Sequence, residues 1–434
     1  MKGLSWAAII RLGLVQTALG AIIVLTTSTL NRVMVVELAL PATLPGLLVA
    51  IHHGVQMLRP RLGYGSDMGQ RRTPWIIGGM AVLALGGIIA ASAVALMGVS
   101  LPWGVALAAF GFFLVGLGVG AAGTSLLAML ASLVEPERRA PAATILWVMM
   151  IMGFAVTAGF AGKLLDPFSP GRLIAVTSVV SLVAFLLAVV AITGIERGDR
   201  APVAQHGEKP AFRAVLAEVW ADPSARRFTV FVFISMLAYS AADLLLEPFA
   251  GEVFGRSIGQ STTLAGMQNG GTLGGMIVMA IFGSGIFGGR LASLRLWTVG
   301  GCLASAAALI ALAIAPRHAT EVPLEALYVA LGLANGAFAA AALASMMQLA
   351  GQARTGTRMG IWGAAQAIAF AVGGFGGTVI CDLARWLLGA AQPAYAAVFM
   401  AEALLFVVSA ILASRLAVTR LPALRLSPMK EAVS

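Results

Sequence analysis

The chain has 434 residues, of which 59% are hydrophobic and only 11% are charged, and its formal net charge is +10 at pH 7. Soluble domains carry about 25% charged residues, so this composition excludes a soluble globular protein and indicates a polytopic membrane protein. In such a protein the basic excess reports orientation and contact with membrane lipid, and it does not point to a nucleic-acid partner.

About twelve apolar segments follow one another along the chain, each near the roughly 20 residues that a helix needs to cross a bilayer. Only helices and closed barrels satisfy backbone polar groups in lipid, and these runs are too long for strands, so we predict an all-α fold. No cleavable signal peptide is expected, because the first segment lacks a small-residue cleavage site. The segments are expected near residues 12–35, 43–60, 74–97, 103–133, 142–163, 172–195, 228–247, 262–283, 295–315, 324–350, 359–381 and 394–417.

The basic residues are distributed unevenly between the loops. With both termini on the inner side, roughly 22 Lys and Arg residues fall on that side and roughly 6 on the other, which sets the orientation. The sequence therefore predicts that both termini are cytoplasmic.

A polar linker at residues 196–227 divides the segments into two sets of six. Within it, Phe212 to Trp220 has apolar residues at helical spacing, which predicts a short amphipathic helix on the inner membrane surface; a solvated linker helix is the alternative. The expected domains are an N-terminal six-helix half at 1–195, the linker at 196–227, a C-terminal six-helix half at 228–418 and a cytoplasmic tail at 419–434.

The two halves also repeat each other in sequence. Gly116–Gly120 corresponds to Gly332–Gly336, and Trp147 corresponds to Trp362. Parallel six-helix halves, here offset by about 215 residues around a linker, are the plan of major facilitator transporters. The glycine runs lie inside apolar segments with no strand before them, so they predict helix packing rather than a nucleotide loop.

The loop between the second and third segments contains Gly63, Asp67, Arg71 and Arg72. These residues resemble the major facilitator loop signature, although the spacing from Asp67 to Gly69 is one residue short. The resemblance implies a gating loop between two helices that slide. The alternative is an ordinary positively charged inner loop.

Three stretches carry a narrower resemblance: Thr29–Leu38 (TLNRVMVVEL), Gly63–Asp67 with Arg71–Trp75 (GYGSD, RRTPW), and Asp243–Gly255 (DLLLEPFAGEVFG). Together they resemble the PucC/LhaA family of phototrophic bacteria. The short loop around Asp67 and the 44.5 kDa mass resemble its subgroup labelled "bacteriochlorophyll synthase 44.5 kDa chain".

The resemblance implies a membrane assembly factor that binds or delivers bacteriochlorophyll, a magnesium chlorin, while light-harvesting and reaction-centre complexes are built. Its implied partners are bacteriochlorophyll-synthesis enzymes and antenna or reaction-centre polypeptides. Its implied location is the inner, intracytoplasmic or chromatophore membrane. The alternative is a major facilitator transporter of a small amphipathic solute. A catalytic synthase subunit is a third reading, but no Asp-rich loop pair, catalytic triad, nucleotide loop or metal cluster is recognised in the sequence, so we expect no enzyme.

Polar residues cluster at the outer ends of two helices that correspond in the two halves. Charges inside a membrane are costly and are expected to be paired or to face a cavity. We therefore predict a periplasmic latch between the halves. Three alternatives remain open for these residues. They form a structural salt bridge, with Arg32 facing Glu247 or Asp243, or they form a polar latch at the mouth of a pigment or partner site. In the third alternative the helix ends are freely solvated. The latch residues are Asn31, Arg32, Glu37, Asp243, Glu247 and Glu252.

His52 and His53 lie within the second segment. A neutral imidazole is a common axial ligand of chlorin magnesium, so either histidine is a candidate pigment ligand; the alternative is a hydrogen bond between helices. Because neighbouring residues point about 100° apart on a helix, only one of the two is expected to face the interior. Glu402, deep in the last segment, is predicted to be a buried carboxyl group or a residue at the lipid edge.

Overall fold

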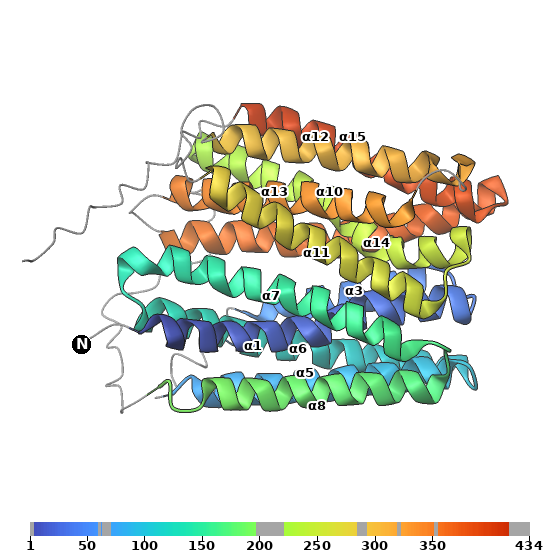
Figure 1. Ribbon diagram of the computed structural model, residues 1–434, viewed down its shortest axis with the longest axis horizontal. Helices are drawn as coiled ribbons and strands as arrows, with labels where there is room; N and C mark the ends of the chain where they lie inside the picture. Colours follow the sequence, from blue (N-terminus) through green and yellow to red (C-terminus); the bar gives the residue numbers. More distant parts are fainter. Residues whose placement is uncertain are drawn as a thin grey trace, which may run out of the picture.

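The computed structural model describes residues 4–59, 62, 71–196, 221–283, 293–318, 323–350 and 355–415. Long helices lie side by side along one axis (Figure 1). The first helix changes pitch along its length, as α1 (Trp6–Val24), η1 (Leu25–Thr29), α2 (Leu30–Arg32) and η2 (Val33–Glu37). The others are α3 (Thr43–Val55) with η3 (Gln56–Leu58), α5 (Thr73–Met97), α6 (Leu101–Leu133), α7 (Pro136–Leu165), α8 (Pro170–Ile192), α10 (Pro223–Phe254), α11 (Ile258–Gly283), α12 (Leu294–Ile314) with η5 (Ala315–His318), α13 (Leu324–Ala350), α14 (Thr355–Leu388) and α15 (Ala391–Ser414).

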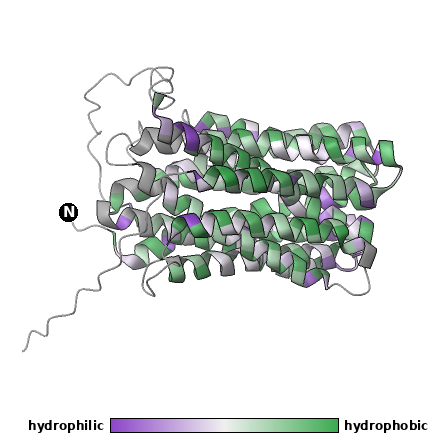
Figure 2. Cartoon of the chain, turned by 90° about the horizontal axis from the view of Figure 1, so that it is seen from above, coloured by the Kyte–Doolittle hydropathy of each residue, from purple (hydrophilic) through white to green (hydrophobic). Residues whose placement is uncertain are grey.

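The prediction of an all-α, polytopic membrane protein is confirmed. A helix lies over every predicted apolar segment, and ten helices in the described part of the chain are long and apolar enough to cross a membrane. The other two helices are α3, which has 13 α-helical residues, and α11, which contains Gln268 and Asn269. Figure 2 shows hydrophobic residues along most of the helix length.

Several helices run beyond the apolar segments that predicted them. α10 continues past residue 247 to Phe254, and α14 continues past residue 381 to Leu388. The added turns carry Glu252 and Arg385, which pair with each other, so the charges that ended the apolar pattern do not end the helices.

Local signals explain many of the helix starts. Ser5, Ser169 and Ser293 each accept a hydrogen bond from the backbone N–H three residues on, which is the usual role of an N-cap serine. Prolines in the first turn of α5, α6, α7 and α8 occupy positions where their missing N–H is not needed.

Helices α1 to α8 form the N-terminal half and α10 to α15 the C-terminal half, which lie one above the other in Figure 1. The halves meet where α3 packs against α14 and where α7 packs against α11. We call the end near Trp6, Ile192 and Pro223 the linker end (left in Figure 1), and the opposite one the far end. The predicted helix at Phe212–Trp220 lies outside the described residues, and the domain boundaries stay a prediction.

Two corresponding glycines set how closely the helices of each half approach. A Cβ added at Gly116 of α6 would lie 2.5 Å from the carbonyl oxygen of His52 in α3. Its counterpart, Gly332 of α13, meets the carbonyl oxygen of Gln268 in α11 in the same way. The repeated glycines therefore act in packing, as small residues do between membrane helices.

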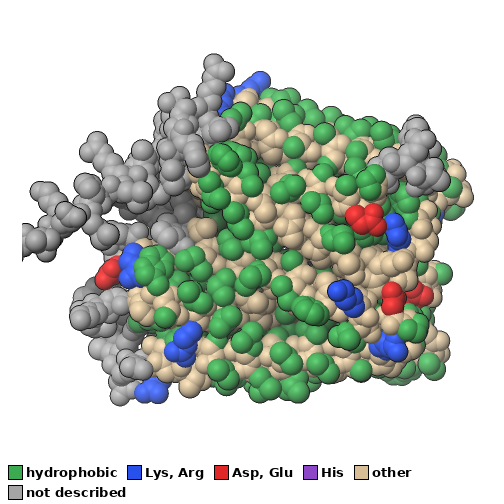
Figure 3. Space-filling model, in the orientation of Figure 1, with side chains coloured by type: hydrophobic (Ala, Val, Ile, Leu, Met, Phe, Trp, Pro, Cys, Tyr) green, Lys and Arg blue, Asp and Glu red, His purple; other side chains and the backbone are tan. Residues whose placement is uncertain are grey.

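The face shown in Figure 3 has charged side chains gathered toward its two ends and a wide, mainly apolar middle. Exposed apolar side chains near the middle of α8 include Val179, 60% exposed, and Val183, 58% exposed. This surface is suited to contact with lipid chains.

Candidate functional site

The first helix is irregular where it carries its polar residues. The π-helical segments η1 and η2 flank the short α2, which contains Asn31 and Arg32. π-helical turns widen the backbone and are frequent at functional sites. Both side chains are buried, with Asn31 1% and Arg32 2% exposed, and both reach the C-terminal half.

Arg32 bridges the two halves by hydrogen bonds rather than by the predicted ion pair. Its Nε donates to Ser261 Oγ at 3.0 Å, and its Nη2 donates to the Arg256 carbonyl oxygen at 2.8 Å. Its ionic partner is Glu37 on the same helix, in place of Glu247 or Asp243. Gly251 makes the room, because a Cβ there would lie 3.1 Å from Arg32 Nη2.

Asn31 satisfies a backbone group that a proline leaves unpaired. Pro248 lies inside α10 and has no N–H to donate to the carbonyl oxygen four residues earlier, that of Leu244. The Asn31 side-chain amide donates to this oxygen from the other half. The proline and the asparagine therefore form one contact, although they are far apart in sequence.

Replacing Asn31 by leucine is expected to lower the free energy of unfolding by about 1–3 kcal/mol, because the Leu244 carbonyl oxygen loses its donor. In a Pro248→Ala background the same substitution should lower the free energy of unfolding by less, since the new backbone N–H of residue 248 can donate to the Leu244 carbonyl oxygen. A double-mutant cycle measured by unfolding of the purified protein in detergent checks this coupling. Strict additivity of the two substitutions would contradict it.

The remaining predicted latch residues lie in three different settings. Glu247 is 1% exposed and accepts a hydrogen bond from Thr262 Oγ1 at 3.0 Å. Glu252 contacts its own half: Arg385 donates to it through Nη1 at 3.0 Å and Nη2 at 2.5 Å. Asp243 is half-buried on α10. The structure thus brings Asn31, Arg32 and Glu37 together with the Glu247 region, whereas Glu252 belongs to an ion pair within the C-terminal half.

Glu402 is buried within the C-terminal half, as one of the two predicted alternatives, a buried carboxyl group, requires. The other alternative, a residue at the lipid edge, does not match this burial. Its Oε1 accepts a hydrogen bond from the backbone N–H of Ala242 in α10 at 2.7 Å. Its Oε2 is buried without a hydrogen-bonding partner among the described residues.

Two further carboxylates join the halves at the far end, and neither was among the predicted site residues. Asp382 of α14 accepts hydrogen bonds from the backbone N–H groups of Ala42, at 3.0 Å, and Thr43, at 2.6 Å, so it caps α3 of the other half. Asp166, at the end of α7, accepts from the Gly259 N–H at 3.1 Å and from Ser257 Oγ at 2.6 Å, so it caps α11.

These two caps are related by the internal repeat. α3 and α11 are counterparts, α7 and α14 are counterparts, and Asp166 and Asp382 are separated by nearly the repeat offset of about 215 residues. Each carboxylate also lies at a helix N-terminus, where negative charge is favoured. The shared offset is the sequence signal that would have revealed them.

His52 and His53 lie at the linker end of α3. His52 is 2% exposed and His53 is half-buried, so the two rings face different surroundings, as expected from their positions on the helix. His52 Nε2 lies 2.9 Å from Gln56 Nε2, and the His53 ring packs against Phe370 of α14 with 5.3 Å between ring centroids. The pair therefore stands where the two halves meet.

The predicted gating loop is only partly described. Gly63 and Asp67 lie outside the described residues. The backbone N–H groups of Arg72 and Thr73 donate to the carboxylate of Glu196, at 2.9 and 3.0 Å, so a residue after α8 caps the start of α5. Arg72 also donates to the Ala128 carbonyl oxygen in α6. These contacts tie the linker end of three helices together.

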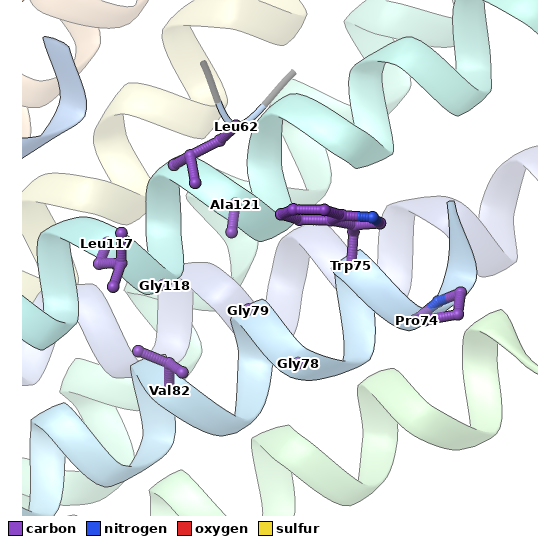
Figure 4. A pocket seen from close by; sticks show the side chains of 9 residues that line it. All are labelled: Leu62, Pro74, Trp75, Gly78, Gly79, Val82, Leu117, Gly118 and Ala121. Atoms are coloured by element: carbon purple, nitrogen blue, oxygen red, sulfur yellow. The ribbon is translucent and has the colours of Figure 1, made fainter. Parts of the chain in front are cut away.

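A groove of about 360 Å³ opens between α5 and α6 (Figure 4). The Trp75 ring reaches from α5 toward Ala121 of α6, and the groove floor includes glycines. Leu85 and Phe113 continue the same helix faces and are 53% and 40% exposed, which places the groove on an outward surface. Its lining is Leu62, Pro74, Trp75, Gly78, Gly79, Val82, Leu117, Gly118 and Ala121.

A second hollow, of about 310 Å³, lies at the far end between α7 and α11. It contains the paired charges of Arg256 and Glu325, whose side chains are 3.1 Å apart, and the capping carboxylate Asp166. Neither hollow lies beside His53.

Comparison with known proteins gives consistent matches over nearly the whole chain. A family model described as "PUCC protein" matches residues 29–421. A protein of Rhodobacter capsulatus named "Bacteriochlorophyll synthase 44.5 kDa chain" is 52% identical over 422 residues, covering 96% of this chain and 97% of that protein. "Protein PucC" of Cereibacter sphaeroides is 30% identical over 440 residues, covering 95% and 94%.

Among solved structures, a D-xylose-proton symporter superimposes with a TM-score of 0.74 at 14% identity, covering 96% of this chain and 99% of that one. At this identity the likeness shows the fold alone. That fold is the major facilitator one predicted from the repeat, and the protein is an integral membrane protein.

Proposed function

The chain belongs to the PUCC family, and on this premise we propose that it is a membrane assembly factor that binds or delivers bacteriochlorophyll while light-harvesting and reaction-centre complexes are built. The name of the Rhodobacter capsulatus relative, which is 52% identical over 422 residues, connects that protein with bacteriochlorophyll and supports the assignment. We assign no catalytic step, because the described carboxylates and imidazoles join helices rather than surround a reacting group.

The observation that carries the proposal is the setting of the histidine pair. Apolar side chains are exposed on both sides of His53 along the chain, Leu47 of α3 at 46% and Met57 of η3 at 66%. A Cβ added at Gly54, the residue after His53, would meet nothing within 4 Å, so the surface there is open. An imidazole at the edge of an open apolar surface suits a flat, apolar ring with a metal at its centre.

We propose that the protein lies in the inner or chromatophore membrane with its linker end in the cytoplasm. Arg11, Arg59, Arg71 and Arg72 all lie at that end, and Arg11 donates to carbonyl oxygens at the end of α8. An excess of Lys and Arg on the cytoplasmic side is the general rule for such proteins.

The groove between α5 and α6 is proposed to receive the single transmembrane helix of an antenna polypeptide. At about 360 Å³ it is at the low end of the range for ligand pockets. Gly78 allows close approach of another helix backbone, because a Cβ there would meet nothing within 4 Å, and small residues act in this way in membranes. The groove is therefore better suited to a row of side chains on one face of a helix than to a whole pigment molecule.

Replacing Gly78 by leucine is expected to abolish co-purification of such a polypeptide while leaving the fold intact, because a Cβ at Gly78 meets nothing within 4 Å. Gly79 is the matched control: a Cβ there would lie 2.5 Å from the backbone nitrogen of Ala122, so Gly79→Leu should lower stability. Pull-down and thermal unfolding of both variants test this. Unchanged pull-down by Gly78→Leu would contradict the docking site.

A deletion strain tests the proposed function as a whole. Loss of antenna absorbance with normal solute uptake and efflux is expected, and purification in mild detergent should recover the chain with a pigment-synthesis enzyme or an antenna polypeptide. Normal antenna levels in the deletion strain would overturn the assignment.

A second candidate function is secondary transport of a small amphipathic solute. Three carboxylates within the C-terminal half favour it, because intramembrane carboxylates mark proton pathways in many transporters. These are Asp243, Glu247 and Glu402, of which the last two are 1% and 3% exposed. Under this alternative the deletion strain keeps its antenna and loses a proton-dependent flux, and Glu402→Gln reproduces the loss.

A further inference from the structure

Gln56 connects both histidines to an arginine at the linker end of α3. Its side-chain Oε1 accepts a hydrogen bond from Arg59 Nη2. Its Nε2 lies 2.9 Å from His52 Nε2 and 3.5 Å from His53 Nδ1. One amide group therefore faces one guanidinium and two imidazoles.

Arg59 sets the orientation of this amide, and the amide sets the tautomers. A guanidinium only donates, so Oε1 must face Arg59 and the NH₂ group must face the rings. The ring nitrogens that face an NH₂ group must accept. A neutral His53 then carries its proton on Nε2, and a neutral His52 carries its proton on Nδ1.

This arrangement leaves one buried donor unsatisfied. His52 Nδ1 is buried and has no hydrogen-bonding partner among the described residues. Turning the Gln56 amide over would place Oε1 toward the rings, where it accepts from His52 Nε2–H and His53 Nδ1–H. His52 would then bury no unpaired N–H, while Arg59 would lose its acceptor. Arg59 is exposed, so water can hydrate its guanidinium after the amide turns, whereas the buried His52 Nδ1–H of the present orientation has no such substitute. The present orientation keeps the Arg59 hydrogen bond, and the turned orientation removes the unpaired donor of His52.

On the basis of the proposed function, we propose that Gln56 is an amide switch that couples Arg59 to the ligand state of His53, and that His53 Nε2 ligates the magnesium of bacteriochlorophyll when Arg59 releases Gln56. In the present orientation Nε2 carries a proton and cannot ligate. In the turned orientation the proton moves to Nδ1 through water, the imidazole stays neutral, and the Nε2 lone pair is free.

His53 is the ligand rather than His52 because of their surroundings. His52 is 2% exposed and is enclosed by α6, where Gly116 packs against its backbone. His53 is half-buried and borders the open surface at Gly54. Once Oε1 accepts from its Nδ1–H, Gln56 becomes the hydrogen-bonding partner that orients a ligating imidazole, as such groups do at metal sites.

The test titrates the purified full-length chain in mild detergent with bacteriochlorophyll and, separately, with the magnesium-free pigment. Pigment absorbance gives both dissociation constants, and resonance Raman spectroscopy reports the coordination number of the magnesium. The wild type should prefer the magnesium form, and His53→Leu should reduce this preference by at least about 10-fold, because loss even of a group that only orients a metal ligand costs about 10- to 100-fold. His52→Leu should leave it nearly unchanged.

Two further variants test the switch itself. Gln56→Glu always presents an acceptor to the imidazoles, and Arg59→Leu frees the native amide to turn, so both should raise the preference for the magnesium form. Gln56→Leu, which has no acceptor, is the matched control and should not raise it. A preference lowered by both Gln56→Glu and Arg59→Leu would overturn the switch, and a preference kept by His53→Leu would overturn the ligand assignment.

The outcomes separate this inference from the proposed function. If the wild type binds both pigment forms equally, bacteriochlorophyll binding stands and ligation by His53 is wrong. If it binds neither form, the pigment-binding function fails and the inference fails with it.

Discussion

Replacing Glu37 by leucine is expected to lower the free energy of unfolding by about 3–5 kcal/mol, the cost of leaving a buried charge without its partner. Arg32 is 2% exposed and Glu37 is 31% exposed, so the guanidinium depends on the pair far more than the carboxylate does. Losing the carboxylate would leave a positive charge within the membrane span.

The matched variants give this prediction its direction. Arg32→Leu should cost less than Glu37→Leu, because it removes the buried charge and leaves mainly the Arg256 carbonyl oxygen without its donor. The double variant should be more stable than Glu37→Leu alone. Glu37→Gln keeps an acceptor for Arg32, so its free energy of unfolding should lie between those of the wild type and Glu37→Leu. Unfolding of purified variants in detergent measures all four. Arg32→Leu proving the more damaging single change would contradict this account of the bridge.

Removing both Asp166 and Asp382 is expected to open the far end. Each carboxylate caps a helix of the opposite half, and loss of a cap costs about 0.5–2 kcal/mol. The two contacts lie at different helix pairs and should act nearly independently. Together they should shift the equilibrium between closed and open far ends by about tenfold or more, since each 1.4 kcal/mol is a factor of ten.

A cysteine at Thr378 reports this opening. Thr378 is fully buried at the contact of α14 with α3, where it faces Gly46. Labelling of Thr378→Cys by a membrane-impermeant thiol reagent should be slow in the native background and about tenfold faster or more with both aspartates replaced by alanine. Glu135→Ala, which removes an exposed carboxylate at the linker end, is the control and should not change the rate. An unchanged rate in the double variant would show that the caps do not hold the far end closed.

The sequence was sufficient for the helices and their pairing into halves, because apolar length and a repeated glycine pattern are direct consequences of packing in lipid. It was insufficient for the partners of the polar residues. The segment containing Asp243 was expected to end at residue 247, so Pro248 was placed outside the helix. The backbone oxygen that it leaves for Asn31 could then not be foreseen.

The predicted partner of Arg32 shows a related limit. The sequence contains several acids near the ends of the two corresponding helices, and charge alone does not choose among them. The π-helical segments around α2 turn Arg32 toward Ser261 and bring Glu37 within reach. Side-chain direction on an irregular helix is set by its pitch, which the pattern of apolar residues does not show.

The proposal that this protein carries bacteriochlorophyll is tested most directly by the near-infrared absorbance spectrum of the chain purified in mild detergent from phototrophically grown cells. We predict a bacteriochlorophyll band that elutes with the protein and that is lost or strongly reduced in His53→Leu. A purified, folded chain with no such band, and none after bacteriochlorophyll is added, would contradict the proposal.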